Sequence, residues 1–179
     1  MYNSMPPLQL NSNSKYKAVM KTDVGEVEIE LYPDVAPYTV NSFIFLAKEG
    51  FYDGTIFHRV IGDFVVQGGD PTGTGRGGPG YNIPDEFPGS AGMYEVGTLA
   101  MANTGQQDSG GSQFFIVVGP HGESLPPKYT IFGKVISGMD NIFHIALDGA
   151  SANESSGMGK PQTIHSINSI EIQELENTN

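Results

Sequence analysis

The segment Gly73–Gly78 reads G-T-G-R-G-G and fits G-x-G-x-x-G, the pattern of loops that bind the pyrophosphate of a dinucleotide. Such a loop works only where the N-terminus of a helix follows it and meets the phosphates. Here Pro79 and Gly80 follow, and this pair cannot open a packed helix of the required kind. We therefore interpret residues 73–78 as a loop and not as a nucleotide site.

A second pattern, Asp108-Ser109-Gly110-Gly111, is similar to the neighbourhood of a serine-protease nucleophile, and His58 precedes it in the chain. A catalytic triad also needs a buried acid that orients the histidine and an oxyanion hole. No candidate acid stands out between His58 and Ser109, so a turn rich in small residues is the better interpretation. The other histidines, His121, His144 and His165, lack metal-ligand spacing, and we predict no metal site.

Two longer segments combine one cation with amide and aromatic side chains. Residues 57–70 read F-H-R-V-I-G-D-F-V-V-Q-G-G-D, and residues 101–116 contain M-A-N-T-G followed by G-S-Q-F-F-I. Alone, Arg59 on a strand would be a surface residue, and Phe64 and Phe115 would be core residues. Taken together, the two segments plainly resemble the cyclophilins. Residues 36–43 and 129–135 extend the resemblance, which covers about residues 16 to 174.

The resemblance implies a peptidyl-prolyl cis/trans isomerase that accelerates rotation about Xaa-Pro bonds and assists protein folding. Because only an amide rotates, the reaction needs no nucleophile, cofactor or metal. Rotation has a barrier of ~18–20 kcal/mol, and a guanidinium beside the twisted prolyl nitrogen would lower it. The implied catalytic residues are Arg59 and Gln67, with Gln67 holding Arg59 in place. The implied substrate-binding residues are Phe64, Val65, Ala102, Asn103, Gln113, Phe115, Leu125 and Tyr129.

Three positions depart from the family pattern. Val65 stands where Met is common, and Tyr129 stands where His is frequent. Ser124 stands where many members have a Trp that donates a hydrogen bond to the drug cyclosporin, and this chain has no Trp. We therefore expect weakened cyclosporin binding.

The elements that must position these residues are short. The alternation of Val27, Ile29 and Leu31 with glutamates predicts a strand with one face in the core. Apolar spacing, Pro37 and Gly50 predict a helix over residues 36–50, and a second helix is predicted over 139–147. Further strands are predicted over residues 17–22, 55–60, 64–67, 97–102, 113–117 and 130–135. A loop over 148–161 leads to a closing strand region over 164–172, whose imperfect alternation allows a bulge.

Many strands and two helices in one small domain indicate a barrel or sandwich with helices over its open ends. The resemblance makes this a mainly β fold, a closed eight-stranded antiparallel β-barrel capped by two α-helices. A barrel of that size is filled by side chains, so the active site would lie on its outer wall. We predict a disordered N-terminal tail over residues 1–14, the isomerase domain over 15–175, and a C-terminal tail over 176–179.

Composition limits the other function classes. The 179 residues are about one domain, with 24 glycines, 12 prolines and only 16% charged residues. The net charge of −11 and the lack of a basic run argue against nucleic-acid binding, and no apolar stretch reaches membrane-spanning length. Cysteine is absent, which fits a cytoplasmic protein, although a trimmed secretion signal would not be visible. We expect a monomer whose partners are proline-containing peptides and unfolded or folded client proteins.

Three functions stay open at this point: an active isomerase, a module that only binds proline-containing loops, and a hydrolase that uses Ser109. Arg59 and Gln67 favour the isomerase, since a pure binder has no need of a donor aimed at the prolyl nitrogen. The hydrolase lacks its acid.

Overall fold

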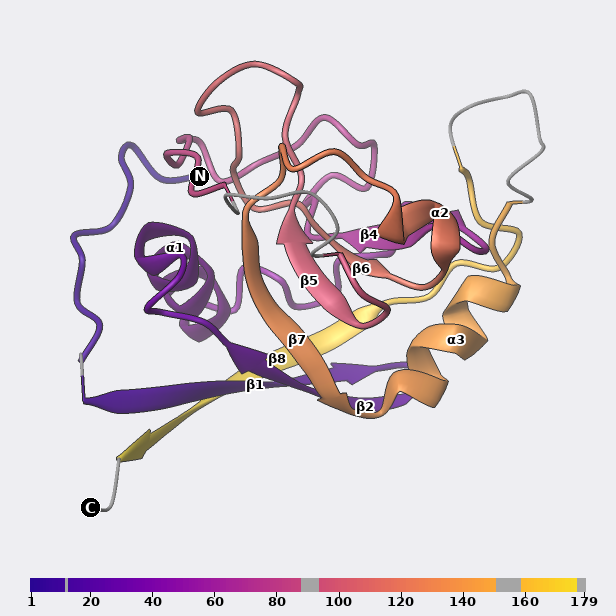
Figure 1. Cartoon of the computed structure of the whole chain (residues 1–179), viewed down its shortest axis with the longest axis horizontal. Coiled ribbons are helices and arrows are strands. Elements are labelled where there is room, and N and C mark those ends of the chain that lie inside the picture. Colours follow the sequence, from indigo (N-terminus) through magenta and orange to yellow (C-terminus); the bar gives the residue numbers. More distant parts are fainter. Residues whose placement is uncertain (12, 88–93, 151–158, 177–179) are drawn as a thin grey trace.

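The computed structural model describes residues 1–11, 13–87, 94–150 and 159–176. Its centre is an eight-stranded antiparallel sheet in the order β3-β4-β6-β5-β7-β2-β1-β8 (Figure 1). The strands are β1 (Ser14–Thr22), β2 (Gly25–Leu31), β3 (Arg59–Ile61), β4 (Val65–Gly68), β5 (Thr98–Met101), β6 (Phe114–Val117), β7 (Ile131–Ser137) and β8 (Ile167–Glu176). The mainly β class, the strand number and the antiparallel pairing are as predicted.

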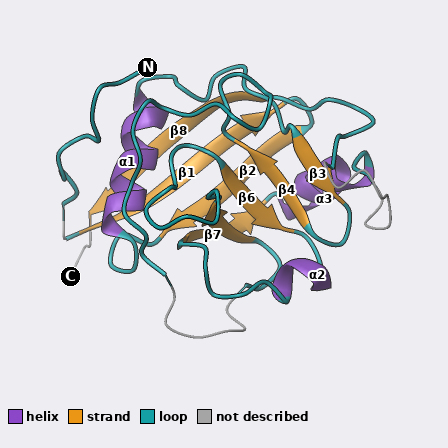
Figure 2. Ribbon diagram, turned by 90° about the horizontal axis from the view of Figure 1, so that it is seen from above, coloured by secondary structure: helices purple, strands orange, loops and turns teal. Residues whose placement is uncertain are grey.

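Three helices lie among the described residues: α1 (Pro37–Lys48), α2 (Pro120–Glu123) and α3 (Met139–Leu147). Helices α1 and α3 are the two that the sequence predicted, and they lie at opposite ends of the sheet (Figures 1 and 2). Helix α2 is a single turn that sequence periodicity did not predict, because four residues are too few to display a helical repeat.

The first turn of α1 is capped from elsewhere in the chain. Ala36, at the position before the helix, provides no side-chain cap. Glu86 takes that role, since its carboxylate accepts hydrogen bonds from the backbone N–H groups of Tyr38 (3.1 Å) and Thr39 (2.9 Å). A carboxylate at this end also interacts favourably with the helix dipole.

The period-two alternation of the strands separates two apolar clusters. On β6, Phe114 and Ile116 point into the main core beside α1, whereas Phe115 and Val117 point to the other face. That outer face carries a second, smaller buried cluster that includes Tyr94 and Ala100. The outer wall therefore has its own apolar floor on which a site can be built.

The described structure does not show the closed barrel that was predicted, because β3 and β8 are the two ends of the strand order. The segment before β3 nevertheless meets the start of β8. Gly54 N–H donates to the carbonyl of Ile167 (2.8 Å), and Phe57 N–H donates to that of His165 (3.0 Å). The predicted irregularity in β8 is confirmed: Thr22 pairs with Ile167 and Lys21 with Ser169, so one residue of β8 is bulged out.

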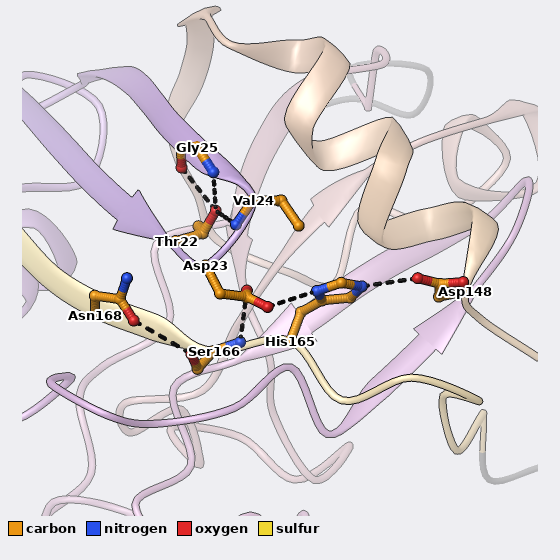
Figure 3. Close-up of polar contacts among 8 residues, drawn as sticks. All are labelled: Thr22, Asp23, Val24, Gly25, Asp148, His165, Ser166 and Asn168. Carbon is orange, nitrogen blue, oxygen red and sulfur yellow. Dashed lines mark hydrogen bonds and ion pairs between the residues drawn. The ribbon is translucent and has the colours of Figure 1, made fainter.

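A buried histidine ties three elements together at this junction (Figure 3). His165 is only 5% exposed, and its two ring nitrogens each lie 2.9 Å from a carboxylate oxygen, of Asp23 and of Asp148. Asp23 belongs to the β1–β2 turn, Asp148 directly follows α3, and His165 precedes β8. Ser166 N–H also donates to Asp23 (3.0 Å), so the turn is fastened to the start of β8.

The N-terminal segment lies along α1 (Figure 1). Asn41 of α1 donates its side-chain amide to the carbonyl of Pro7 (3.0 Å) and accepts from the N–H of Gln9 (2.9 Å). Tyr2 N–H donates to the carbonyl of Pro79 (2.8 Å), and its ring packs edge-on against Phe45. Residues 2, 7 and 9 thus contact α1 and Pro79, while the disordered tail over residues 1–14 stays a prediction. Parts of the predicted 148–161 loop and of the C-terminal tail, residues 151–158 and 177–179, lie outside the described residues.

Candidate active site

A pocket opens on the outer wall of the sheet and collects almost all of the residues that the sequence implied. Its lining residues are Arg59, Phe64, Val65, Gln67, Ala102, Asn103, Phe115, Leu125 and Tyr129. Its volume of about 110 Å³ is below the several hundred Å³ of sites for drug-sized ligands. The pocket therefore suits one small side chain of a longer ligand.

Strand register brings the polar and aromatic sides of the pocket together. Arg59 on β3 is the direct partner of Gln67 on β4, and Gln67 is the partner of Phe115 on β6. Because directly paired residues point to the same face of a sheet, these three side chains form one row across the outer wall.

Arg59 is held as a half-buried cation. Its Nη1 donates to Oε1 of Gln67 at 3.3 Å, and its Cζ lies 5.5 Å from the ring centroid of Phe64. Burial lowers the pKa of Arg59, while the nearby Tyr129 opposes this change. An arginine stays charged in such a setting, so the pocket presents a cationic donor; in the described part of the chain Gln67 is the one acceptor of its guanidinium N–H groups.

Aromatic and aliphatic side chains form the opposite wall. Phe115 is only 4% exposed, and the ring of Tyr129 meets it edge-on with 5.3 Å between centroids. Leu125 lines the pocket and follows α2 by two residues. The single turn of α2 packs against the backbone of Phe64, just before β4. A side chain at Gly122 would place its Cβ 2.5 Å from the carbonyl oxygen of Phe64, so this close approach requires glycine.

Asn103 presents backbone groups at the pocket edge. Its side-chain amide donates to the carbonyl of Lys128 (2.8 Å), and its side-chain oxygen accepts from Gly105 N–H (3.0 Å). Among the residues that the structure describes, the backbone N–H and C=O of Asn103 make no hydrogen bond within the protein. An extended peptide can pair with them as it would with a strand edge.

Gln113, which the resemblance implied as a substrate-binding residue, is not among the residues that line this pocket, and its contact with substrate stays a prediction. Its Oε1 accepts from Nε2 of Gln67 (3.1 Å), and its Nε2 donates to the carbonyl of Gly77 (2.9 Å). Its position is therefore that of a support for Gln67.

The competing sequence patterns do not assemble into sites. Ser109 donates to the carbonyl of Gln106 (2.7 Å) and accepts from Thr104 N–H, so its hydroxyl is used within its own turn. The ring nitrogens of His58 have no hydrogen-bond partner in the described part of the chain. The residues after the glycine-rich segment, 79–87, form no helix.

Neither a metal cluster nor a membrane-spanning helix is found within residues 1–11, 13–87, 94–150 and 159–176.

Two supporting residues were missed by sequence reasoning. Tyr94 is fully buried behind the pocket, and its hydroxyl donates to the carbonyl of Tyr129 (2.9 Å) and accepts from its N–H (3.1 Å). Asp70 is a fully buried carboxylate next to β4. Tyr94 was missed because its partner Tyr129 lies 35 residues away in sequence, and Asp70 because the fold of the turn that follows it sets its contacts.

Comparison with known proteins assigns a family. The model for "Cyclophilin type peptidyl-prolyl cis-trans isomerase/CLD" matches residues 17–172. Peptidyl-prolyl cis-trans isomerase B of Bacillus subtilis is 55% identical over 118 residues, which cover 66% of this chain and 81% of that protein. Peptidyl-prolyl cis-trans isomerase-like 1 of Rhizopus delemar is 40% identical over 163 residues, covering 89% and 97% of the two chains.

A solved structure agrees with these matches. The crystal structure of a Cryptosporidium parvum cyclophilin type peptidyl-prolyl cis-trans isomerase aligns with a TM-score of 0.76 and 34% identity, over 89% of this chain and 98% of that one. The same protein solved in the presence of the dipeptide Ala-Pro aligns with a TM-score of 0.73 and 32% identity, over 91% and 99% of the two chains.

Proposed function

The chain belongs to the cyclophilin-type peptidyl-prolyl cis-trans isomerases, and we propose that Arg59 is the group with which it accelerates rotation about Xaa-Pro bonds. The observation that carries this proposal is the placement of a single fixed cation beside an apolar slot. Arg59 is held by Gln67 on one side and lies over Phe64 on the other.

Each wall of the pocket has one task in this proposal. Phe64, Phe115 and Leu125 hold the proline ring, and the backbone of Asn103 pairs with the peptide on one side of the bond. One half of the substrate is thereby fixed while the other half turns. The pocket volume fits this division, because only the ring has to enter it.

Arg59 can stabilise the twisted state more than the planar one. In the planar amide the nitrogen lone pair is delocalised, and twisting localises it into a hydrogen-bond acceptor. A guanidinium N–H aimed at that nitrogen therefore gains most when the bond is halfway turned, which is the condition for catalysis. The half-buried setting strengthens the effect, since apolar walls reduce screening by water.

The substrates are proline-containing peptides and proteins, in keeping with the family. We propose that extended segments of unfolded or folded clients lie along the outer wall, with proline in the slot. The Ala-Pro dipeptide named for the Cryptosporidium relative is consistent with such a slot.

We also propose that the sheet closes into a full barrel behind this wall. The hydrogen bonds of Gly54 and Phe57 to the start of β8, together with the bridge between Ile56 and Ser166, support that closure. A closed barrel would keep β3, and with it Arg59, in a fixed position relative to β4 and β6.

The role of Arg59 is tested by a protease-coupled assay on a proline peptide. We expect Arg59→Ala to lower kcat/KM by about 100-fold or more, the usual loss for one donor to a transition state. The matched control is Lys15→Ala, which removes an equal charge at an exposed site of β1. Equal activity of the two variants would refute the proposed role.

A further inference from the structure

Asp70 is a buried carboxylate just after β4. It is 0% exposed, and no ion pair to it is present in the described part of the chain. Its Oδ1 accepts from the backbone N–H (2.7 Å) and hydroxyl (2.8 Å) of Thr72, and its Oδ2 accepts from Gly75 N–H (2.5 Å). Burial alone would raise the pKa of Asp70, but hydrogen bonds from Thr72, Gly77 and Gly75 lower it overall. The carboxylate is therefore the centre around which the following turn is wrapped.

The glycines of this segment are required by that wrapping. Gly75 has a φ of +83°, a backbone conformation that side-chain-bearing residues rarely adopt. A Cβ at Gly77 would lie 2.0 Å from Oδ1 of Asp70, which no relaxation of a side chain could accommodate cheaply while the carboxylate is pinned. The glycine-rich pattern that resembles a nucleotide loop is thus explained by an internal carboxylate in place of a bound phosphate.

The turn is connected to the active site by a continuous series of side-chain hydrogen bonds. The carbonyl of Gly77 accepts from Nε2 of Gln113 at 2.9 Å. Oε1 of Gln113 accepts from Nε2 of Gln67 at 3.1 Å, and Oε1 of Gln67 accepts from Nη1 of Arg59 at 3.3 Å. Each amide is oriented by the previous one, because its donor and acceptor ends are both used.

We propose that Asp70 is a positioning residue for the isomerase, which sets the direction of the Arg59 guanidinium through Gly77, Gln113 and Gln67. This proposal rests on the proposed role of Arg59. Asp70 is not among the residues that line the pocket, so it acts by fixing where the Gly77 carbonyl lies.

Asp70→Asn is the most direct test. The substitution keeps the volume but turns one acceptor into an NH₂ donor that faces the N–H groups of Thr72 or Gly75. The turn must then rearrange, and the Gly77 carbonyl moves. Misplacing a catalytic group by about 1 Å can cost up to ~100-fold in rate, so we expect kcat to fall about ten- to hundredfold.

The apolar slot does not depend on this turn, so we expect KM for the proline peptide to change little. A role in general stability would instead lower the melting temperature and leave kcat of the folded enzyme unchanged, which would overturn the proposal. Asp34→Asn makes the same chemical change at an exposed site and should keep wild-type kinetics. If Asp70→Asn does not fold, Thr72→Val removes one donor to the carboxylate and should lower kcat in the same direction by a smaller factor.

A double-mutant cycle identifies the route. Gln113→Ala breaks the series between the turn and Gln67, so adding Asp70→Asn, or Thr72→Val, to Gln113→Ala should lower kcat by less than about twofold further. Independent effects, which multiply in the double variant, would overturn the proposed route.

If Arg59→Ala retains activity, the role of Arg59 itself fails. If Arg59→Ala loses activity while Asp70→Asn and Thr72→Val do not, only the role of Asp70 fails.

Discussion

Removing the hydroxyl of Tyr94 tests whether the pocket wall is held from behind. Tyr94→Phe keeps the buried ring, so no cavity forms, but Tyr129 loses a donor to its carbonyl and an acceptor for its N–H. Each lost hydrogen bond costs about 0.5–1.5 kcal/mol, so we expect the free energy of unfolding to fall by about 1–3 kcal/mol. The Tyr129 ring, which packs on Phe115, should also become less fixed.

Two measurements on Tyr94→Phe separate these effects. Urea unfolding gives the loss of stability, and steady-state kinetics should show a raised KM for the proline peptide with kcat less affected, because Arg59 is untouched. The control is Tyr38→Phe, which removes a hydroxyl from a 41% exposed ring on α1 and should change neither quantity. The reasoning is refuted if Tyr94→Phe matches wild type within about 0.5 kcal/mol and in KM.

Three further outcomes are expected. Activity should survive exhaustive EDTA treatment and dialysis, because amide rotation needs no metal; a loss restored by a divalent ion would contradict this. Cyclosporin should inhibit about tenfold to hundredfold more weakly than it inhibits Trp-bearing cyclophilins, and Ser124→Trp should lower the inhibitory concentration; tight inhibition of wild type would refute the assignment of Ser124. Burial lowers the pKa of His165, but hydrogen bonds to Asp148 and Asp23 raise it above its ordinary value overall. Its stabilising contribution is therefore complete below the unfolded pKa of about 6.5 and is lost as pH rises through the folded pKa. The free energy of unfolding should therefore fall as pH rises above about 6.5, and His165→Asn, unlike the exposed His121→Asn, should flatten this slope.

The spacing of apolar residues was sufficient to predict the strands and helices that bury one face in the core. Val27, Ile29 and Leu31 alternate with glutamates, and these three side chains are buried in β2 as predicted. Helix α1 has both Pro37 at its start and an apolar face, so its limits were recovered within two residues. The strand predicted over residues 55–60 begins earlier than β3, which starts at Arg59. Residues 55–58 belong to no strand of the sheet, and Ile56 makes only isolated bridges, to Asp70 and Ser166.

The site was predictable as a set of residues but not as an arrangement. Resemblance named the residues that line the pocket, but it did not reveal the hydrogen bonds by which Gln113 joins Gln67 to the Gly77 carbonyl. Those bonds depend on backbone conformation at Gly77, 36 residues away from Gln113 in sequence. Tyr94 was missed because its partners are backbone groups of Tyr129, 35 residues away in sequence. Asp70 was missed because its contacts depend on how the turn after it folds.

The central claim is that Arg59 lowers the barrier to rotation and does not merely help to bind proline. Exchange NMR on an Ala-Pro-containing peptide, at saturating protein, measures the cis–trans interconversion rate of the bound peptide separately from its Kd. For Arg59→Ala we expect this rate to fall by about 100-fold or more, while Kd changes by less than about threefold. A bound-state rate equal to that of wild type, with activity lost only through weaker binding, would contradict the account.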